Sequence, residues 1–174
     1  EKYFADVDTT DLPVVEESLI PSMIGCYTTM VRIKQANRRL ENKLAATQKI
    51  MTYATLTKDA QYDNEELNRA KKALAFCQFH DILPGTSVQP ADEDCLRKLS
   101  FGEEIADKLY TKAFIKLCEG QKVAKQGEIP VMVFNPHPYE IDGEFEIGFM
   151  LENQNWNDNE FTTAQVYDIK GNPL

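Results

Sequence analysis

The sequence lacks several features that would assign it to a broad class of protein. It has no run of about 18 consecutive apolar residues, so no membrane span is expected. Its first residues, EKYFADVDTTDLP, carry no apolar core of the kind found in a secretory signal. Positive charge is scarce, because the formal net charge is −9. A phosphate-binding surface needs excess Lys and Arg, so we expect no nucleic acid partner and no membrane partner.

Metal-ligating residue types are also few. The chain has two histidines, His80 and His137, and four cysteines that show neither a C-x-x-C pair nor the spacing of a metal site. Three of the cysteines fall on or beside apolar helical positions, where a free thiol behaves as a small hydrophobic group. Unpaired cysteines favour a reducing compartment, so a cytoplasmic location is expected.

The periodicity of apolar residues predicts three amphipathic helices. The first runs from about Met30 to Leu56, with Thr28 or Thr29 as its N-cap. The second opens at Asp63, where Glu66 follows as in a capping box, and ends near His80 because Pro84 disfavours helical geometry. The third runs from about Asp92 to Gly120. Their inner stripes are Ile33, Ala36, Leu40, Leu44, Met51 and Ala54; Leu67, Ala70, Leu74 and Cys77; and Cys95, Leu99, Gly102, Ile105, Leu109, Ala113 and Leu117.

Beyond Gly120 the pattern changes to that of strands. Residues 129–134 are apolar and rich in β-forming types, 145–151 alternate apolar and polar side chains, and 161–169 read as a third strand. A few strands leave exposed edges and an incomplete core. The expected fold class is therefore α+β, an antiparallel three-helix bundle followed by an incomplete β-sheet or β-sandwich segment.

The same patterns predict the domain organisation. Residues 1–29 are expected to be an irregular entry segment, 30–120 a three-helix domain, and 121–174 the start of a β domain. The sequence begins without an initiator Met and stops directly after the turn residues KGNPL. We therefore expect a piece of a longer polypeptide.

The stretch QFHDILPGTSV, residues 78–88, carries the candidate site. His80 lies three residues beyond Cys77, so it is expected near the core side at the end of the second helix. There the helix dipole favours an imidazolium, and a neutral imidazole can ligate a metal. His80 supplies only one of the roughly three or four protein donors that zinc takes. A metal site would have to be shared with residues outside the chain, and a structural histidine at a helix terminus remains the competing interpretation.

Three separated motifs resemble those of one enzyme family. GCYTTMVRIKQANRRLENKL starts at Gly25 and contains G-x-Y-T-[ST] followed by K-x-x-N-R-x-x-E. QFHDILPGTS contains H-D-x-x-x-G-[ST], and VFNP lies at 133–136. Their order and spacing are similar to those of family 38 glycoside hydrolases, the α-mannosidases. The resemblance covers about residues 13 to 140.

The resemblance implies an architecture and a chemistry. In this family an α/β catalytic barrel precedes a three-helix middle domain and β-sandwich domains. The motif histidine ligates zinc and the following aspartate contacts mannose, which implies that His80 is a zinc ligand and Asp81 a substrate contact. The other ligands and both reacting carboxylates belong to the barrel, so no catalytic residue is expected in this chain. The implied partners are an α-mannoside or mannose-containing glycan and the barrel of the same polypeptide, and the isolated chain is expected to be inactive.

A second hypothesis is a non-catalytic helical protein-interaction module with a β appendage. It is consistent with the missing catalytic carboxylates, because a bare three-helix bundle would show the same apolar stripes. It does not account for His80 and Asp81 followed by Gly85.

Overall fold

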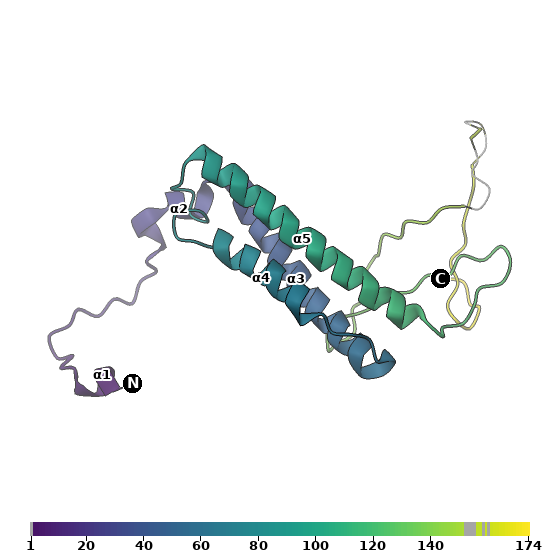
Figure 1. Ribbon diagram of the computed structural model, residues 1–174, viewed down its shortest axis with the longest axis horizontal. Helices are drawn as coiled ribbons and strands as arrows, with labels where there is room; N and C mark the ends of the chain where they lie inside the picture. Colours follow the sequence, from purple (N-terminus) through teal and green to yellow (C-terminus); the bar gives the residue numbers. More distant parts are fainter. Residues whose placement is uncertain (1, 152–155, 158, 160) are drawn as a thin grey trace. The chain divides into compact units, whose positions relative to one another are not determined.

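The computed structural model of the chain describes residues 2–151, 156–157, 159 and 161–174. The chain divides into two compact units, Glu1–Gln121 and Lys122–Leu174. The first unit contains three short N-terminal elements and three longer helices (Figure 1). The short elements are α1 (Lys2–Asp6), η1 (Ile20–Met23) and α2 (Gly25–Thr28), and the longer helices are α3 (Val31–Lys58), α4 (Asn64–Cys77) and α5 (Gln89–Cys118).

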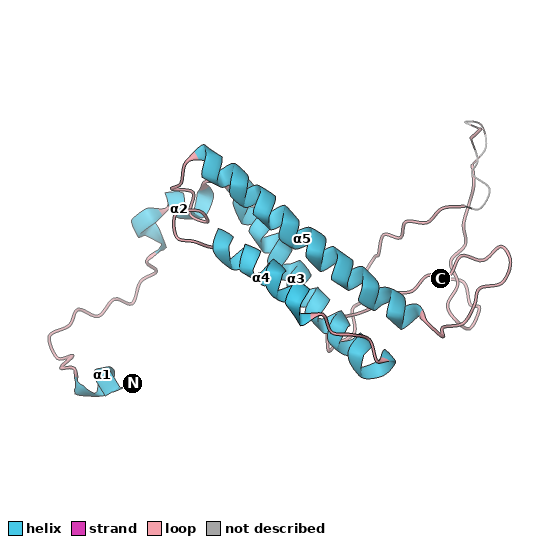
Figure 2. Cartoon of the chain, viewed as in Figure 1, coloured by secondary structure: helices cyan, strands magenta, loops and turns pink. Residues whose placement is uncertain are grey.

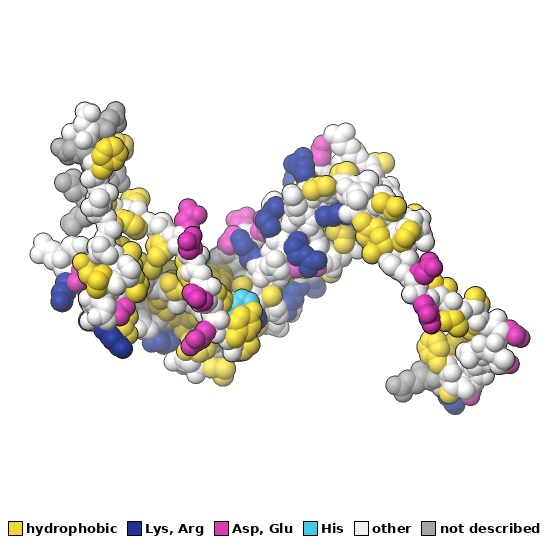
Figure 3. All heavy atoms as spheres, turned by 180° about the vertical axis from the view of Figure 1, so that it is seen from behind, with side chains coloured by type: hydrophobic (Ala, Val, Ile, Leu, Met, Phe, Trp, Pro, Cys, Tyr) yellow, Lys and Arg dark blue, Asp and Glu magenta, His cyan; other side chains and the backbone are white. Residues whose placement is uncertain are grey.

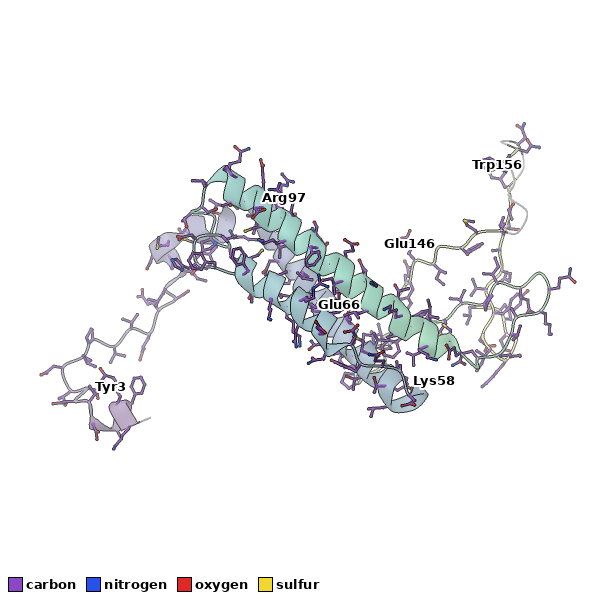
Figure 4. The ribbon with its side chains drawn as sticks, viewed as in Figure 1. Tyr3, Lys58, Glu66, Arg97, Glu146 and Trp156 are labelled. Atoms are coloured by element: carbon purple, nitrogen blue, oxygen red, sulfur yellow. The ribbon has the colours of Figure 1, made fainter. Side chains whose placement is uncertain are left out.

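Helices α3, α4 and α5 form a three-helix bundle in which neighbouring helices along the chain are antiparallel (Figure 1). Lys43 of α3 forms an ion pair with Asp107 of α5, with Nζ and Oδ1 2.6 Å apart. Lys58, which ends α3 (Figure 4), donates from Nζ to the carbonyl oxygen of Glu119 just beyond α5 at 2.7 Å. Helices α3 and α5 therefore run in the same direction, and α4, which lies between them in the sequence, runs in the opposite direction. The predicted bundle is confirmed.

The apolar stripes expected from the sequence form the core of this bundle. Every member of the α3 and α5 stripes is buried, and so are Leu67, Ala70 and Cys77 of α4. Leu74 is only half-buried. Thr47 is fully buried although it is polar, because its hydroxyl donates to the carbonyl oxygen of Ala106 at 3.3 Å. The period of 3.6 residues thus identified the core-facing side of all three helices.

Gly102 lets α3 and α5 approach closely. A Cβ atom added at Gly102 would lie 2.7 Å from Cδ2 of Leu40, and Leu40 is fully buried. No real Cβ contact is that short, so any larger residue would displace Leu40 from its packed position. Gly102 costs helix propensity, but it sets the distance between the two longest helices.

The ends of the helices differ from the sequence prediction in three places. Helix α4 begins as expected, since the Asp63 side chain accepts from the Glu66 amide at 3.1 Å, but it ends at Cys77 rather than His80. The amide of Gln78 still bonds to the carbonyl oxygen of Leu74 at 3.1 Å, and the chain then leaves the helix. Pro84 restricts Leu83, the residue before it, and so does not account for a helix end six residues earlier.

Helix α5 begins at Gln89 and not near Asp92, because Pro90 belongs to its first turn. Proline is favoured there, since its missing amide is one that no helical carbonyl would receive. Asp92 is buried instead of capping, and its Oδ1 accepts from the Ser87 hydroxyl at 2.7 Å.

The N-cap of α3 is Met30 in the left-handed conformation, with a φ of 49°. Neither Thr28 nor Thr29 caps the helix, so that expectation was wrong. The Thr29 hydroxyl lies against the carbonyl oxygen of Pro84, which is 55 residues away in the sequence. A tertiary contact therefore replaced the local cap.

The cysteines of the bundle behave as core residues. Cys77 and Cys95 are buried, and the Cys77 thiol donates to the carbonyl oxygen of Cys95 at 3.5 Å. Burial, with the neighbouring Cys95 adding to it, raises the pKa of Cys77 to about 12. The thiol therefore stays protonated and is not a nucleophile.

Side chains on the outside of the bundle carry both signs of charge (Figure 3). Arg38 pairs with Glu41 at 2.9 Å, and Arg39 pairs with Glu103 at 3.2 Å. Such exposed pairs contribute little to stability, and they leave the basic residues of α3 with acidic neighbours. None of the helices in the described residues is long and apolar enough to cross a membrane.

The second unit contains no strand among its described residues (Figure 2). The predicted strands 129–134, 145–151 and 161–169 are therefore not formed here, and one isolated bridge joins Tyr167 to Pro173. Strands depend on ladder hydrogen bonds to a partner and on burial of one face. Apolar residues of the second unit are mostly exposed, so these segments lack the burial that would hold them in a sheet.

The second unit contains two tight turns that side-chain hydrogen bonds close. The Asn135 side chain donates to the carbonyl oxygen of Tyr139 at 2.7 Å, which closes the turn predicted around the prolines. The Asp168 carboxylate accepts from the amides of Lys170 and Asn172, each at 2.8 Å. Hydrogen bonds hold the pKa of Asp168 below its usual value, and the one from the Asn172 side chain contributes most.

The close approach at Gly102 yields a stability prediction. Gly102→Val should lower the free energy of unfolding by about 1–3 kcal/mol, because the new side chain overpacks the contact with Leu40. Ser100→Val is the matched control, since Ser100 is exposed on the same helix and gains the same β-branched side chain. Urea unfolding followed by circular dichroism measures both. Equal effects of the two substitutions would show that α3 and α5 do not meet at Gly102.

Candidate functional site

The candidate site is the turn that follows α4. We call residues 79–86 the His-Asp turn. It lies at the end of the bundle where α3 and α5 begin (Figure 1). Its own amides hold it together: Ile82 bonds to the carbonyl oxygen of Phe79 at 2.9 Å, and Thr86 bonds to that of Asp81 at 3.1 Å. The Gly85 amide bonds to the carbonyl oxygen of Ile82 at 3.0 Å.

The turn buries one side chain and exposes two. Ile82 is 7% exposed and anchors the turn in the core. The side chains of His80 and Asp81 are 78% and 54% exposed. The expectation that His80 lies near the core side was wrong, because α4 ends at Cys77 and the helical period no longer applies three residues later. His80 and Asp81 are therefore presented to whatever lies beyond the end of the bundle.

The two exposed side chains are adjacent. His80 Nε2 lies 3.4 Å from Asp81 Oδ2, which is an electrostatic contact rather than a short hydrogen bond. The Thr86 hydroxyl donates to the other carboxylate oxygen, Oδ1, at 3.0 Å. The Phe79 ring packs against the imidazole with centroids 4.1 Å apart. Asp81 is thus held between Thr86 and His80.

The first sequence motif meets the turn, although about 50 residues separate them. Lys34, in the first turn of α3, donates from Nζ to the carbonyl oxygen of Leu83 at 2.8 Å and also to that of Thr29. The Thr29 hydroxyl lies 2.7 Å from the carbonyl oxygen of Pro84 and 2.8 Å from that of Gly25. These residues of the G-x-Y-T-[ST] and K-x-x-N-R-x-x-E motifs therefore surround the backbone of the turn.

The rest of the lysine motif continues down the same face of α3. Glu41 accepts from the side chain of Gln78 at 2.8 Å, so it reaches the residue just before the turn. Asn37 is 6% exposed, and its Oδ1 has no hydrogen-bond partner within the described part of the chain. Residues 34, 37, 38 and 41 are spaced so that they share one helical face, and this spacing places the motif beside the turn.

Gly85 fits closely against this motif. Its φ of +86° favours glycine, and a Cβ there would lie 2.6 Å from Met30 Cγ and 2.7 Å from Thr29 Oγ1. A residue with a side chain at position 85 would therefore be strained and would collide with the start of α3.

The donor set of the turn is compatible with part of a metal site. An exposed imidazole is a ligand that zinc prefers, and a carboxylate lies beside it. No group of three or more His, Cys, Asp or Glu that could hold a metal ion occurs among the described residues. The residues therefore fit a metal centre that draws its remaining donors from elsewhere.

Comparison with known proteins places this bundle in one family. Residues 24–117 match the family described as the α-mannosidase middle domain. The chain is 36% identical over 73 residues to α-mannosidase G of Dictyostelium discoideum, covering 42% of this chain and 7% of that protein. It is 27% identical over 117 residues to mouse α-mannosidase 2C1, covering 66% of this chain and 11% of that protein.

Human α-mannosidase 2C1 is similar as well, at 29% identity over 99 residues, which cover 56% of this chain and 9% of that protein. The matches span about a tenth of these relatives' length or less. No solved structure matches the chain significantly. The match to the middle domain includes all of α3, α4 and the His-Asp turn and all but the last residue of α5. The chain therefore belongs to the family of the α-mannosidase middle domain.

Proposed function

We propose that this chain is part of a zinc-dependent, retaining α-mannosidase that acts on α-mannosides or mannose-containing glycans. The observation that carries the proposal is the His-Asp turn. A bundle of the α-mannosidase middle-domain family ends in an exposed histidine and aspartate that are held side by side at 3.4 Å. Side chains so exposed contribute little to folding, so their placement is better explained by a site that they help to form.

His80 would hold the zinc ion as one of its ligands. Its imidazole is accessible, and the burial of Ile82 two residues later fixes the backbone that carries it. Bound zinc would bind and polarise the vicinal hydroxyls of the sugar. Asp81 would contact the mannose, since Thr86 occupies one carboxylate oxygen and the carboxylate is still half-exposed.

The remaining zinc donors and both reacting carboxylates would come from a catalytic barrel of the same polypeptide. Retaining hydrolysis needs a nucleophile and an acid/base about 5 Å apart. The His-Asp turn offers one carboxylate, which is bound to Thr86. We therefore infer that residues 1–29 lead in from the barrel, residues 30–120 are the middle domain, and residues 121–174 start a β-sandwich. By itself the chain would be inactive.

The cysteines support a cytoplasmic location for this enzyme. Cys77 and Cys95 are free thiols, and both lie in the core. Thiols persist in a reducing compartment.

His80→Ala in the full-length enzyme tests the metal role. Loss of a ligand should lower both zinc content and kcat/KM by more than about 100-fold, because changes to residues that merely support ligands cost 10–100-fold. The substitution should leave the melting temperature of the zinc-free protein unchanged, since His80 is exposed. Zinc is measured by elemental analysis and kcat/KM with an aryl α-mannoside.

His137→Ala is the matched control, because it removes the other histidine, which is exposed in the turn around Asn135. It should retain zinc and turnover. Full zinc content and full turnover in His80→Ala would show that the turn is only a helix terminus, as a protein-interaction module would have.

Asp81→Asn separates the substrate role from the metal role. The amide keeps the shape of the side chain but removes the negative charge. We expect kcat/KM for an aryl α-mannoside to fall at least tenfold, with zinc content close to that of the wild type. Loss of zinc in step with loss of turnover would instead make Asp81 a zinc ligand.

A further inference from the structure

We propose that Thr29 and Lys34 are positioning residues for the His-Asp turn. They bind two successive carbonyl oxygens of the turn, those of Pro84 and Leu83, and so fix the place from which His80 and Asp81 reach metal and sugar. The inference rests on the proposed function for its chemical consequence. We call the contacts of Thr29 and Lys34 with these two carbonyl oxygens the clamp. The clamp is observed whatever the chemical function of the turn.

The amides of the turn do not bond to the carbonyl oxygens of Leu83 and Pro84. Within the turn, amides bond to the carbonyl oxygens of Phe79, Asp81 and Ile82. The carbonyl oxygens of Leu83 and Pro84 receive Lys34 and Thr29 instead. These two carbonyl oxygens accept from no amide of the turn, so their partners in the described part of the chain are side chains of another segment. That segment runs from Thr29, just after α2, into the first turn of α3.

Lys34 connects two stretches of backbone at once. An ammonium group has three donors, and here it serves the carbonyl oxygens of Thr29 and Leu83. Hydrogen bonds from a charged donor are stronger than neutral ones, and this side chain is half-buried, so water screens it less. The turn is therefore tied to the same residue, Thr29, whose hydroxyl binds the next carbonyl along.

The backbone before α3 is shaped for this contact. Met30 is in the left-handed region, which is unfavourable for a non-glycine residue and persists only where neighbours impose it. Gly85 lies directly against it, where a Cβ would come within 2.7 Å of Met30 Cγ and Thr29 Oγ1. The turn and the segment before α3 are therefore packed so closely at this point that no side chain fits at position 85.

The clamp can be separated from the fold. Thr29 is exposed and Lys34 is half-buried, whereas the core consists of the apolar stripes and Ile82. Loss of the clamp should therefore leave the bundle folded and loosen only the second half of the turn. Functional groups need placement within about 0.5 Å, so a looser turn should weaken the site without unfolding the protein.

Two pairs of variants in the full-length enzyme test the proposal. Thr29→Val removes the hydroxyl at nearly constant shape, whereas Thr29→Ser keeps the hydroxyl and removes only the methyl group. Lys34→Met removes the ammonium and keeps an apolar stem. Lys43→Met makes the same change on the same helix, where the lysine pairs with Asp107 instead.

Three quantities are measured for each variant: zinc affinity, kcat/KM at saturating zinc, and amide exchange of Gly85 and Thr86. We expect Thr29→Val and Lys34→Met to bind zinc about 10–100-fold more weakly, as changes around a metal ligand do. Exchange at Gly85 and Thr86 should be faster by a similar factor, while the melting temperature of the zinc-free protein stays that of the wild type. Thr29→Ser should recover most of the zinc affinity, and Lys43→Met should match the wild type.

Zinc affinity within twofold of the wild type in both Thr29→Val and Lys34→Met would overturn the positioning role. Equal weakening in Lys43→Met would overturn it too, since the effect would then be general. A wild-type enzyme that neither holds zinc nor cleaves mannosides would instead refute the proposed function. In that case the exchange of Gly85 and Thr86 still decides about the clamp, and unchanged exchange in both variants would overturn it.

Discussion

The carbonyl oxygens of Leu83 and Pro84 impose the constraint on which the site end of the bundle depends. They belong to a turn whose own amides bond elsewhere, so their partners come from the start of α3. This requirement joins the two motifs that stand about 50 residues apart in the sequence. At the same place α3 begins at a left-handed methionine rather than at a capping threonine. The hydroxyl of Thr29 lies against the turn instead.

Burial and exposure are divided within a few residues of the same turn. Ile82 is inserted into the core, whereas His80 and Asp81 on its N-terminal side remain exposed. The long helices of the bundle beneath meet at Gly102 with no space for a Cβ. A firm base, a buried anchor and a clamped carbonyl backbone together hold the imidazole and the carboxylate in one place. Sites built on such supported elements are more accurate than sites on free loops.

Much of the bundle was predictable from the sequence, and the reasons differ for what was not. Periodic apolar residues report which face of a helix is buried, so every residue assigned to the stripes of α3 and α5 is buried, although the stripes omitted the buried Ile50 and Ala106. Local rules failed at Thr29, which does not cap α3 and whose hydroxyl contacts the distant Pro84. The predicted position of His80 was wrong because the prediction extended the helical period beyond Cys77, the last residue of α4. The strands expected between 129 and 169 depend on partners that local pattern does not specify.

The central claim is that this bundle presents His80 to a zinc ion whose other ligands lie elsewhere in the enzyme. A crystal structure of the full-length protein, with diffraction recorded on both sides of the zinc absorption edge, tests it most directly. The account predicts an anomalous peak about 2.0–2.1 Å from a ring nitrogen of His80. It also predicts the Lys34 and Thr29 contacts to the turn unchanged. A zinc ion coordinated without His80, with that side chain left in solvent, would contradict the account.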